Sequence, residues 1–283
     1  MKILKHLLIT AALLMSGTSF ASGSNFAMDT APDLSNDKAA LQHGAKLFVN
    51  YCLNCHAAAS MRYNRLKDIG LSDDQIKDGL LFSADKVGEL MKVSLQPKDA
   101  KEWFGAVPPD LSVIARAKAG SGFSGADYIY TYLRTYYRDA SRPTGWNNLA
   151  YPNSAMPHVL WPLQPTRALQ ITDTESVKNK DGKNEWVKKV STYGLTGEKS
   201  ADSQEVLVSY GGHGSTEHKF ITTNTAAQQQ FDKDAASIAA FMQYMADPSA
   251  AKRKAMGVWV LLFLGIFIVF AYLLNKQYWK DIK

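Results

Sequence analysis

Residues 52–56 read Cys-Leu-Asn-Cys-His, and they contain the only two cysteines in the 283 residues of the chain. This pattern is the attachment signature of a c-type haem, in which both thiols add to the vinyl groups of the porphyrin and the histidine ligates the iron. A structural disulfide, half of a zinc site and a thioredoxin-type redox pair are the alternatives. Zinc would need more good ligands nearby, and the remaining histidines form no second tight pair with cysteine. We therefore predict one covalent haem c, held by Cys52, Cys55 and His56.

Residues 1–21 have the features of a cleaved secretory signal. Lys2 and Lys5 provide a charged start, an apolar run follows over 7–15, and the small residues Ser19 and Ala21 suit a cleavage site before residue 22. The apolar run is too short for a membrane span. We expect the chain to be exported from the cytoplasm, which is where c-type haem is attached in bacteria.

Residues 255–274 form an uncharged stretch near the other end of the chain. About 20 residues at about 1.5 Å each give roughly 30 Å, enough to cross the hydrocarbon core of a bilayer. Basic residues at 252–254 precede the stretch, and aromatic and basic residues follow it. We expect a single-pass protein of the bacterial inner membrane, with residues 22–251 in the periplasm and a cytoplasmic tail at 275–283.

The basic charge of the chain resides in its two ends. The net charge is +6, of which Lys2 and Lys5 contribute two and the segment 252–283 contributes a net five, leaving −1 for residues 22–251. A nearly neutral body excludes a nucleic-acid surface and suits a protein that meets other proteins. About 230 residues without an internal repeat predict one haem domain.

The fold class predicted by the residue pattern is mainly α, with helices at residues 37–50, from 72 onward, and at 83–92, 124–137 and 231–245. Ser35 or Asn36 is expected to cap the first helix, which leads directly into the haem motif. Residues 165–226 differ in composition, because Lys, Asn, Gly, Ser and Thr dominate. We expect a long irregular insertion there, with a small hairpin, outside the haem core.

The sixth iron ligand decides what the haem does, because a thioether closes the iron for electron transfer whereas an open position favours gas or peroxide chemistry. Met91 and Met156 are both candidates by position. Met156 lies in an irregular segment between Pro152 and Pro157 that can hold a thioether rigidly. Spacing alone leaves both candidates open, and a histidine such as His158 or His213 is the remaining possibility.

From about Gly44 to the end, the chain resembles the cytochrome c1 family in a bacterial form, the haem-bearing subunit of the cytochrome bc1 (quinol–cytochrome c oxidoreductase) complex. The resemblance covers the haem motif with residues 61–66 after it, Pro-Pro-Asp-Leu-Ser at 108–112, and the aromatic helix around Tyr128. It continues through 151–157, Met-Ala-Asp-Pro at 245–248 and the terminal span. The resemblance implies an all-α cytochrome c fold with Met156 as the axial ligand.

The same resemblance implies that Arg116, Pro109 and Tyr63 contact the cofactor, with Pro109 shaping the wall of the pocket. The chain departs from the family pattern at several points. Lys118 stands where mitochondrial relatives often have a second arginine near a haem propionate. The loop before Met156 is shorter than in those relatives, and the insertion at 165–226 has no clear mitochondrial counterpart.

The function implied by the resemblance is the relay of single electrons, with no bond chemistry performed by the chain itself. A Rieske iron–sulfur protein would donate the electron and a periplasmic cytochrome c would accept it, within a dimeric complex that includes cytochrome b. A membrane-anchored cytochrome c of a terminal oxidase or another reductase is the alternative. A haem-based ligand-binding sensor, with a vacant or labile sixth position, is an alternative from a different class.

Overall fold

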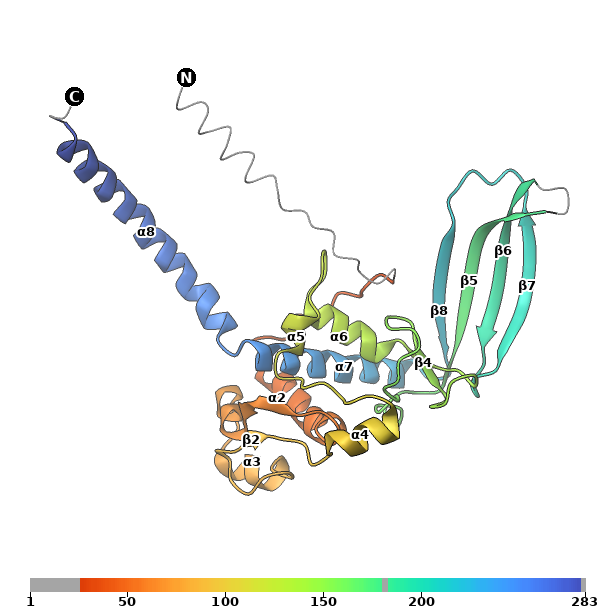
Figure 1. The fold of residues 1–283 in the computed structure, drawn as a ribbon, viewed down its shortest axis with the longest axis horizontal. Helices are drawn as coiled ribbons and strands as arrows, with labels where there is room; N and C mark the ends of the chain where they lie inside the picture. The colour runs from red at the N-terminus through yellow and green to blue at the C-terminus, as the bar shows by residue number, and fades with distance from the viewer. Residues whose placement is uncertain (1–25, 180–182, 281–283) are drawn as a thin grey trace.

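Two helices that are far apart in the sequence pack together at the centre of the helical body. The computed structural model describes residues 26–179 and 183–280, so the expected signal at 1–21 lies outside the described residues. Helix α2 (Lys38–Leu47) packs against α7 (Thr225–Ala246) (Figure 1). A Cβ on Gly44 would lie 2.1 Å from the Ser237 carbonyl oxygen, so glycine permits this close approach. The rings of Phe48 and Phe241 then meet at 5.5 Å between centroids.

Helix α6 (Gly125–Arg134) covers another side of α7, and both of its ends are held by side chains. Ser124 and Asp127 form a reciprocal capping box at its start. At its end, Arg134 pairs with Asp232 of α7 and with Asp29 of the N-terminal segment, each at 2.7 Å. The incoming chain is thereby tied to the same two helices.

Short elements fill the remainder of the body. They are the π-helix η1 (Phe48–Cys52), β1 (Ala58–Arg62), the 3₁₀-helix η2 (Tyr63–Ile69), α3 (Asp73–Gly79), β2 (Leu90–Met91), α4 (Pro97–Phe104), α5 (Ile114–Ala117), β3 (Tyr136–Arg138) and β4 (Trp146–Asn148). Strand β1 pairs with β2, and β3 pairs with β4, both antiparallel. Most of these pieces connect the helices around the main apolar core.

Most of the helices predicted from the sequence are found, although their ends differ, and α7 begins at Thr225 instead of 231. Asp37, rather than Ser35 or Asn36, caps α2, because its carboxylate accepts the Ala40 amide. The helix expected at 83–92 is wrong, since turns and β2 occupy that segment. Helix α6 ends at Arg134, and the following residues form β3 instead of completing the helix.

Residues 167–222 contain a four-stranded antiparallel sheet. The prediction of an irregular insertion with one small hairpin is therefore wrong. The predicted mainly α fold class holds only for the helical body. The strands are β5 (Arg167–Lys178), β6 (Asn184–Tyr193), β7 (Lys199–Leu207) and β8 (Ser215–Thr222), in the order β7-β6-β5-β8. Most of their side chains are at least partly exposed, so the sequence lacks the alternation of apolar and polar residues that marks a half-buried strand.

The sheet is attached to the body at one end only (Figure 1). There Leu169 packs with Tyr137 and Leu149 in a second small apolar cluster. The buried Arg167 guanidinium donates to the backbone carbonyls of Arg134 and Tyr136. The main-chain ladders continue well beyond this contact, and the far end of the sheet projects away from the body.

Helix α8 (Ala250–Tyr278) leaves the body in another direction and contains the span expected at 255–274. Its segment Lys252–Tyr278 is long and apolar enough to cross a membrane, and none of its apolar window is buried within the protein. At the junction, Asp247 accepts hydrogen bonds from Arg116, at 3.0 Å, and from Arg253. These contacts tie the end of α7 to α5.

Candidate haem site

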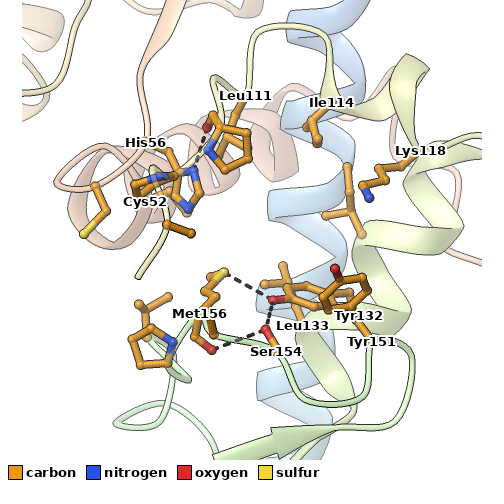
Figure 2. Close-up of a pocket in the computed structure, with 18 of the residues that line it drawn as sticks. Cys52, His56, Leu111, Ile114, Lys118, Tyr132, Leu133, Tyr151, Ser154 and Met156 are labelled. Carbon is orange, nitrogen blue, oxygen red and sulfur yellow. Dashed lines mark hydrogen bonds between the residues drawn. The ribbon is translucent and has the colours of Figure 1, made fainter. Parts of the chain in front are cut away.

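A cavity of about 370 Å³ opens in the body beside the Cys-x-x-Cys-His segment. Three stretches of chain and one residue of α7 surround it: residues 51–56, 104–118, and 128–159 in part, with Met242. Most of the lining side chains are aliphatic or aromatic, which suits the flat apolar faces of a porphyrin. His56 and Met156 project from its two sides, as Figure 2 shows.

The His56 side of the cavity is built by the end of η1. Cys52 is its last residue and is buried, and the amides of Cys55 and His56 both donate to the Cys52 carbonyl oxygen. This turn places both thiols and the imidazole on the lining of one cavity. Burial raises the pKa of the Cys52 thiol to about 12, so the thiol is protonated at neutral pH.

A backbone carbonyl fixes the orientation of the His56 ring. The Nδ1 atom lies 2.7 Å from the carbonyl oxygen of Pro109, so Nδ1 carries the proton and donates it. Burial lowers the pKa of His56 below its ordinary value, which favours the neutral ring. Nε2 therefore retains the lone pair that an iron ion requires, in the arrangement usual for metal-binding histidines.

The loop that carries Pro109 is itself fastened to the segment after the haem motif. The Asp110 carboxylate accepts hydrogen bonds from the amides of Ala59 and Ser112, at 2.7 and 2.8 Å. Leu111 donates its amide to the Ala57 carbonyl oxygen at 2.8 Å. The motif Pro-Pro-Asp-Leu-Ser thus sets the position of the carbonyl that orients the histidine.

The Met156 side of the cavity is built by hydroxyl groups. The hydroxyl of Tyr132 on α6 lies 3.4 Å from the Met156 sulfur as a donor, and the hydroxyl of Tyr136 donates to the Met156 carbonyl oxygen at 3.0 Å (Figure 2). The Tyr132 hydroxyl oxygen also lies 2.9 Å from Ser154 Oγ and 2.7 Å from the Tyr136 hydroxyl oxygen, so its one proton is shared between the sulfur and these oxygens. Burial raises the pKa of Tyr132, which keeps its hydroxyl protonated.

The other ligand candidates lie elsewhere. Met91 is fully buried in β2, opposite Ala58, outside the cavity lining. His158 is buried in a stack on Tyr136, and its Nε2 atom contacts Gln164. Among the described residues, Met156 and Met242 are the methionines that line the cavity. Met242 of α7 is both buried and part of the lining.

Of the three residues expected to contact the cofactor through the family resemblance, only Pro109 lines the cavity. Arg116 is absent from the lining and pairs with Asp247. Tyr63 is fully buried in the core, with its hydroxyl 3.0 Å from Ser83 Oγ. Lys118 does line the cavity, and its ammonium lies 5.1 Å from the centre of the Tyr128 ring.

Tyr132 was not singled out as a site residue from the sequence. The signal available was the spacing of Tyr128, Tyr132 and Tyr136, four residues apart and hence on one face of a helix. Such a stripe is equally typical of a core helix. Its connection with Met156 depends on tertiary structure, because 24 residues separate Tyr132 from that sulfur.

The residues present fit a haem better than a bare metal ion. Two thiols, a histidine with an available Nε2 and a methionine on the opposite side surround an apolar space. Among the described residues that line this space, Lys118 carries the one permanent positive charge, suitable for a propionate. Within the described ranges 26–179 and 183–280, no group of three or more His, Cys, Asp or Glu side chains could hold a metal ion.

Comparison with known proteins identifies one matching family and several similar relatives. The Cytochrome C1 family model matches residues 30–192 and 217–282. A cytochrome c1 from Allochromatium vinosum is 36% identical over 281 residues, covering 99% of this chain and 100% of the relative. A Nitrosomonas europaea protein named ammonia monooxygenase gamma subunit is 39% identical over 282 residues, covering 100% of both chains. A cytochrome c1 from Rhodospirillum rubrum is 26% identical, covering 87% of this chain and 83% of the relative.

The family model leaves residues 193–216 unmatched, which lie inside the segment 165–226 expected to be an insertion. Strand β5, nearly all of β6 and most of β8 lie within the matched part of the chain. Strand β7 and both of its flanking connections do not.

Proposed function

The chain belongs to the cytochrome c1 family, and we propose that it relays single electrons from the Rieske iron–sulfur protein to a periplasmic cytochrome c. It is an electron-transfer subunit of the cytochrome bc1 complex, with one covalently attached haem c. The alternatives of a terminal-oxidase subunit and a ligand-binding sensor are not favoured. The observation that carries the proposal is the placement of His56 and Met156 on opposite sides of one apolar cavity beside Cys52 and Cys55.

In this proposal Cys52 and Cys55 would hold the haem through thioether bonds, and His56 Nε2 and Met156 Sδ would be the iron ligands. When bound, the haem supplies a one-electron change at iron. The chain holds both ligands before any electron arrives: Pro109 orients His56, and Tyr136 holds the Met156 backbone. Fixed ligands suit electron transfer, because little has to move when the charge of the site changes.

Tyr132 is the residue that would tune the thioether. A thioether sulfur has two lone pairs, so Met156 can bind iron with one and accept the Tyr132 hydroxyl proton with the other. The hydrogen bond withdraws electron density from the sulfur and so favours ferrous over ferric iron. We therefore assign Tyr132 as a positioning residue that raises the reduction potential.

Lys118 is our candidate for contact with a haem propionate. It is the cation on the cavity lining, whereas Arg116 is engaged with Asp247 at the start of the membrane helix. The ammonium lies between the rings of Tyr128 and Tyr151, 5.1 and 5.9 Å from their centroids. A lysine supplies a point charge rather than the bidentate fork of an arginine, so this contact would orient a propionate less strictly.

The protein is membrane-anchored, and we propose that the haem body faces the periplasm of a bacterial inner membrane with residues 275–283 in the cytoplasm. Residues 1–21 would act as the export signal, and α8 would be the single span. Cytochrome b and the Rieske protein would be companions in a dimeric complex. A periplasmic location of the haem body agrees with the export that c-type haem attachment requires in bacteria and with the nearly neutral charge of residues 22–251.

Carbon monoxide binding tests the relay. The reduced full-length protein at neutral pH should leave carbon monoxide unbound, because Met156 occupies the sixth position, and reduced Rieske protein should reduce its haem. Rapid formation of a carbon monoxide complex at neutral pH would instead indicate a vacant or labile sixth position and a sensor. Purification of the native membrane assembly should yield cytochrome b and the Rieske protein as companions.

A further inference from the structure

The far end of the four-stranded sheet, which we call the sheet tip, is formed among the described residues by the β7–β8 connection and the adjoining ends of the four strands. Its described residues are 178–179, 183–186 and 206–215. Val208 is 88% exposed, the highest value among the exposed large apolar side chains of the described chain, α8 included. Val206 is 49% exposed nearby. Single exposed valines are common on proteins, so exposure alone assigns nothing.

The β7–β8 turn of the sheet tip is held in shape by its own side chains. The ring of Tyr210 packs against Trp186 with 5.3 Å between centroids, and its hydroxyl donates to the His213 carbonyl oxygen at 3.2 Å. A Cβ on Gly212 would lie 2.4 Å from the Tyr210 hydroxyl, so the glycine leaves room for that ring in its present position. Ser209 adopts a left-handed conformation, with φ of 59°. The turn thus keeps two aromatic rings together while Val208 projects outward.

The position of the sheet tip relative to the membrane helix is the second observation. Figure 1 shows that the far end of the sheet and the far end of α8 both lie on the same side of the helical body. Strand β5 has 12 residues, about 40 Å at roughly 3.3 Å per residue, so the tip stands far from the body. Helix α8 and the sheet are therefore two arms that leave the helical body toward the same side.

We propose that the sheet tip rests on the surface of the bilayer that α8 crosses, as a second membrane contact of the same chain. The half-buried Trp186 beside Tyr210, with the exposed Val208 in the same turn, matches the chemistry of the headgroup–acyl boundary. Lys178 and Lys183 flank the β5–β6 connection, but Glu185 and Glu205 lie close by in the strands. The charges nearly balance, so the contact is apolar rather than electrostatic.

A bilayer fits this surface better than a protein partner does. A stable protein interface covers about 800 Å² on each side, whereas the sheet tip offers only a few apolar side chains. Such a small patch binds lipid weakly by itself. Because α8 already holds the chain at the membrane, however, the contact is intramolecular and needs little intrinsic affinity. Most of the sheet tip also lies in residues 193–216, which the family model leaves unmatched, so it is an addition to the shared haem body.

The test places a fluorescent label on the sheet tip of the full-length, haem-loaded chain in nanodiscs of phosphatidylcholine. The variant Val208→Cys provides one thiol for labelling, since both native cysteines are held in haem thioethers in the proposed function. The matched control is Ser203→Cys, an exposed residue in the same edge strand nearer its middle. The unsubstituted chain should take up no label, because its two cysteines would be bound to haem. Labelling of the unsubstituted chain would contradict haem attachment, which belongs to the proposed function, and not the membrane contact.

Phosphatidylcholine with brominated acyl chains should quench the label at position 208 severalfold more strongly than the label at 203. Iodide in the aqueous phase should give the opposite order. Equal quenching of the two labels by brominated lipid would overturn the proposal. Protection of position 208 from iodide only after cytochrome b and the Rieske protein are added would also overturn it, in favour of a subunit contact.

Discussion

The haem body and the four-stranded sheet are organised by different forces. In the body, a large set of apolar side chains from distant parts of the chain is buried together, and the cavity is one face of that core. Within the described strands β5 to β8, Leu169 and Val187 are the fully buried apolar side chains. The sheet therefore depends mainly on its main-chain ladders, whereas the body depends on packing. Because of this difference, we expect substitutions in the body to change the haem spectrum or potential, and substitutions in the sheet to leave both unchanged.

The largest expected effect is the loss of covalent haem. The double substitution Cys52→Ala and Cys55→Ala removes both thiols of the chain, so no thioether bond to haem can form. Haem staining of the denatured variant should be blank beside an intact unsubstituted control. A persistent covalent band would contradict the assignment of the cavity.

A pair of truncations compares packing in the two regions. Phe241→Ala in α7 removes a fully buried ring that contacts Phe48, and we expect a loss of about 3–5 kcal/mol in the free energy of unfolding. Val206→Ala in β7 alters a half-exposed side chain and should change it by less than about 0.5 kcal/mol. Guanidinium unfolding of the detergent-solubilised chain measures both. Similar losses for the two variants would remove the distinction between the regions.

Tyr132→Phe is a smaller change within the body. It removes the donor to the Met156 sulfur and keeps the ring. A hydrogen bond worth roughly 1 kcal/mol corresponds to about 40 mV for one electron, so the midpoint potential should fall by about that amount. Redox titration measures it.

Tyr128→Phe is the matched control for that experiment. Tyr128 also lines the cavity, and its ring stacks on Tyr132 with 6.0 Å between centroids. Among the described contacts of Tyr128, there is no hydrogen bond to the Met156 sulfur. Its substitution should leave the potential nearly unchanged. Equal shifts for the two variants would show that the Tyr132 hydroxyl has no special role.

The smallest expected effect on the haem comes from removing the sheet. Arg167 and Thr222 are partners across the first rung of β5 and β8, so a short glycine turn can replace residues 169–220. The absorption spectrum and midpoint potential should match those of the full chain. The unfolding midpoint should fall, because Tyr137 and Leu149 lose the cover of Leu169. A changed haem spectrum would show that the sheet supports the site.

The sequence predicted those parts of the molecule that depend on local chemistry. The haem motif and the capped start of α3, where Ser72 and Gln75 form a capping box, are signals within a few residues. The pairing of Arg116 with Asp247 joins positions 131 residues apart, and nothing in the local pattern predicts it. Spacing likewise left both Met91 and Met156 open, because which of them lines the cavity depends on how β2 and the 151–157 loop fold onto the body.

The sheet was missed for a physical reason. Strand β5 begins with an alternation that places Leu169 and Ile171 on one face, but Asp173 and Glu175 continue that same face. In β7 every residue except Leu207 is exposed. A strand held by its backbone hydrogen bonds needs no apolar period, so its sequence resembles a polar loop.

The central claim is that Met156 binds the haem iron opposite His56, and the ferric absorption spectrum of three methionine variants tests it most directly. Met156→Lys should abolish the sulfur-to-iron band near the red end and lower the potential by on the order of hundreds of millivolts, while covalent haem remains. Met91→Leu and Met242→Leu should keep the band, since Met91 lies in the core outside the cavity and Met242 is a buried residue of α7 on the cavity lining. Loss of the band in Met242→Leu or Met91→Leu, with its retention in Met156→Lys, would contradict the account.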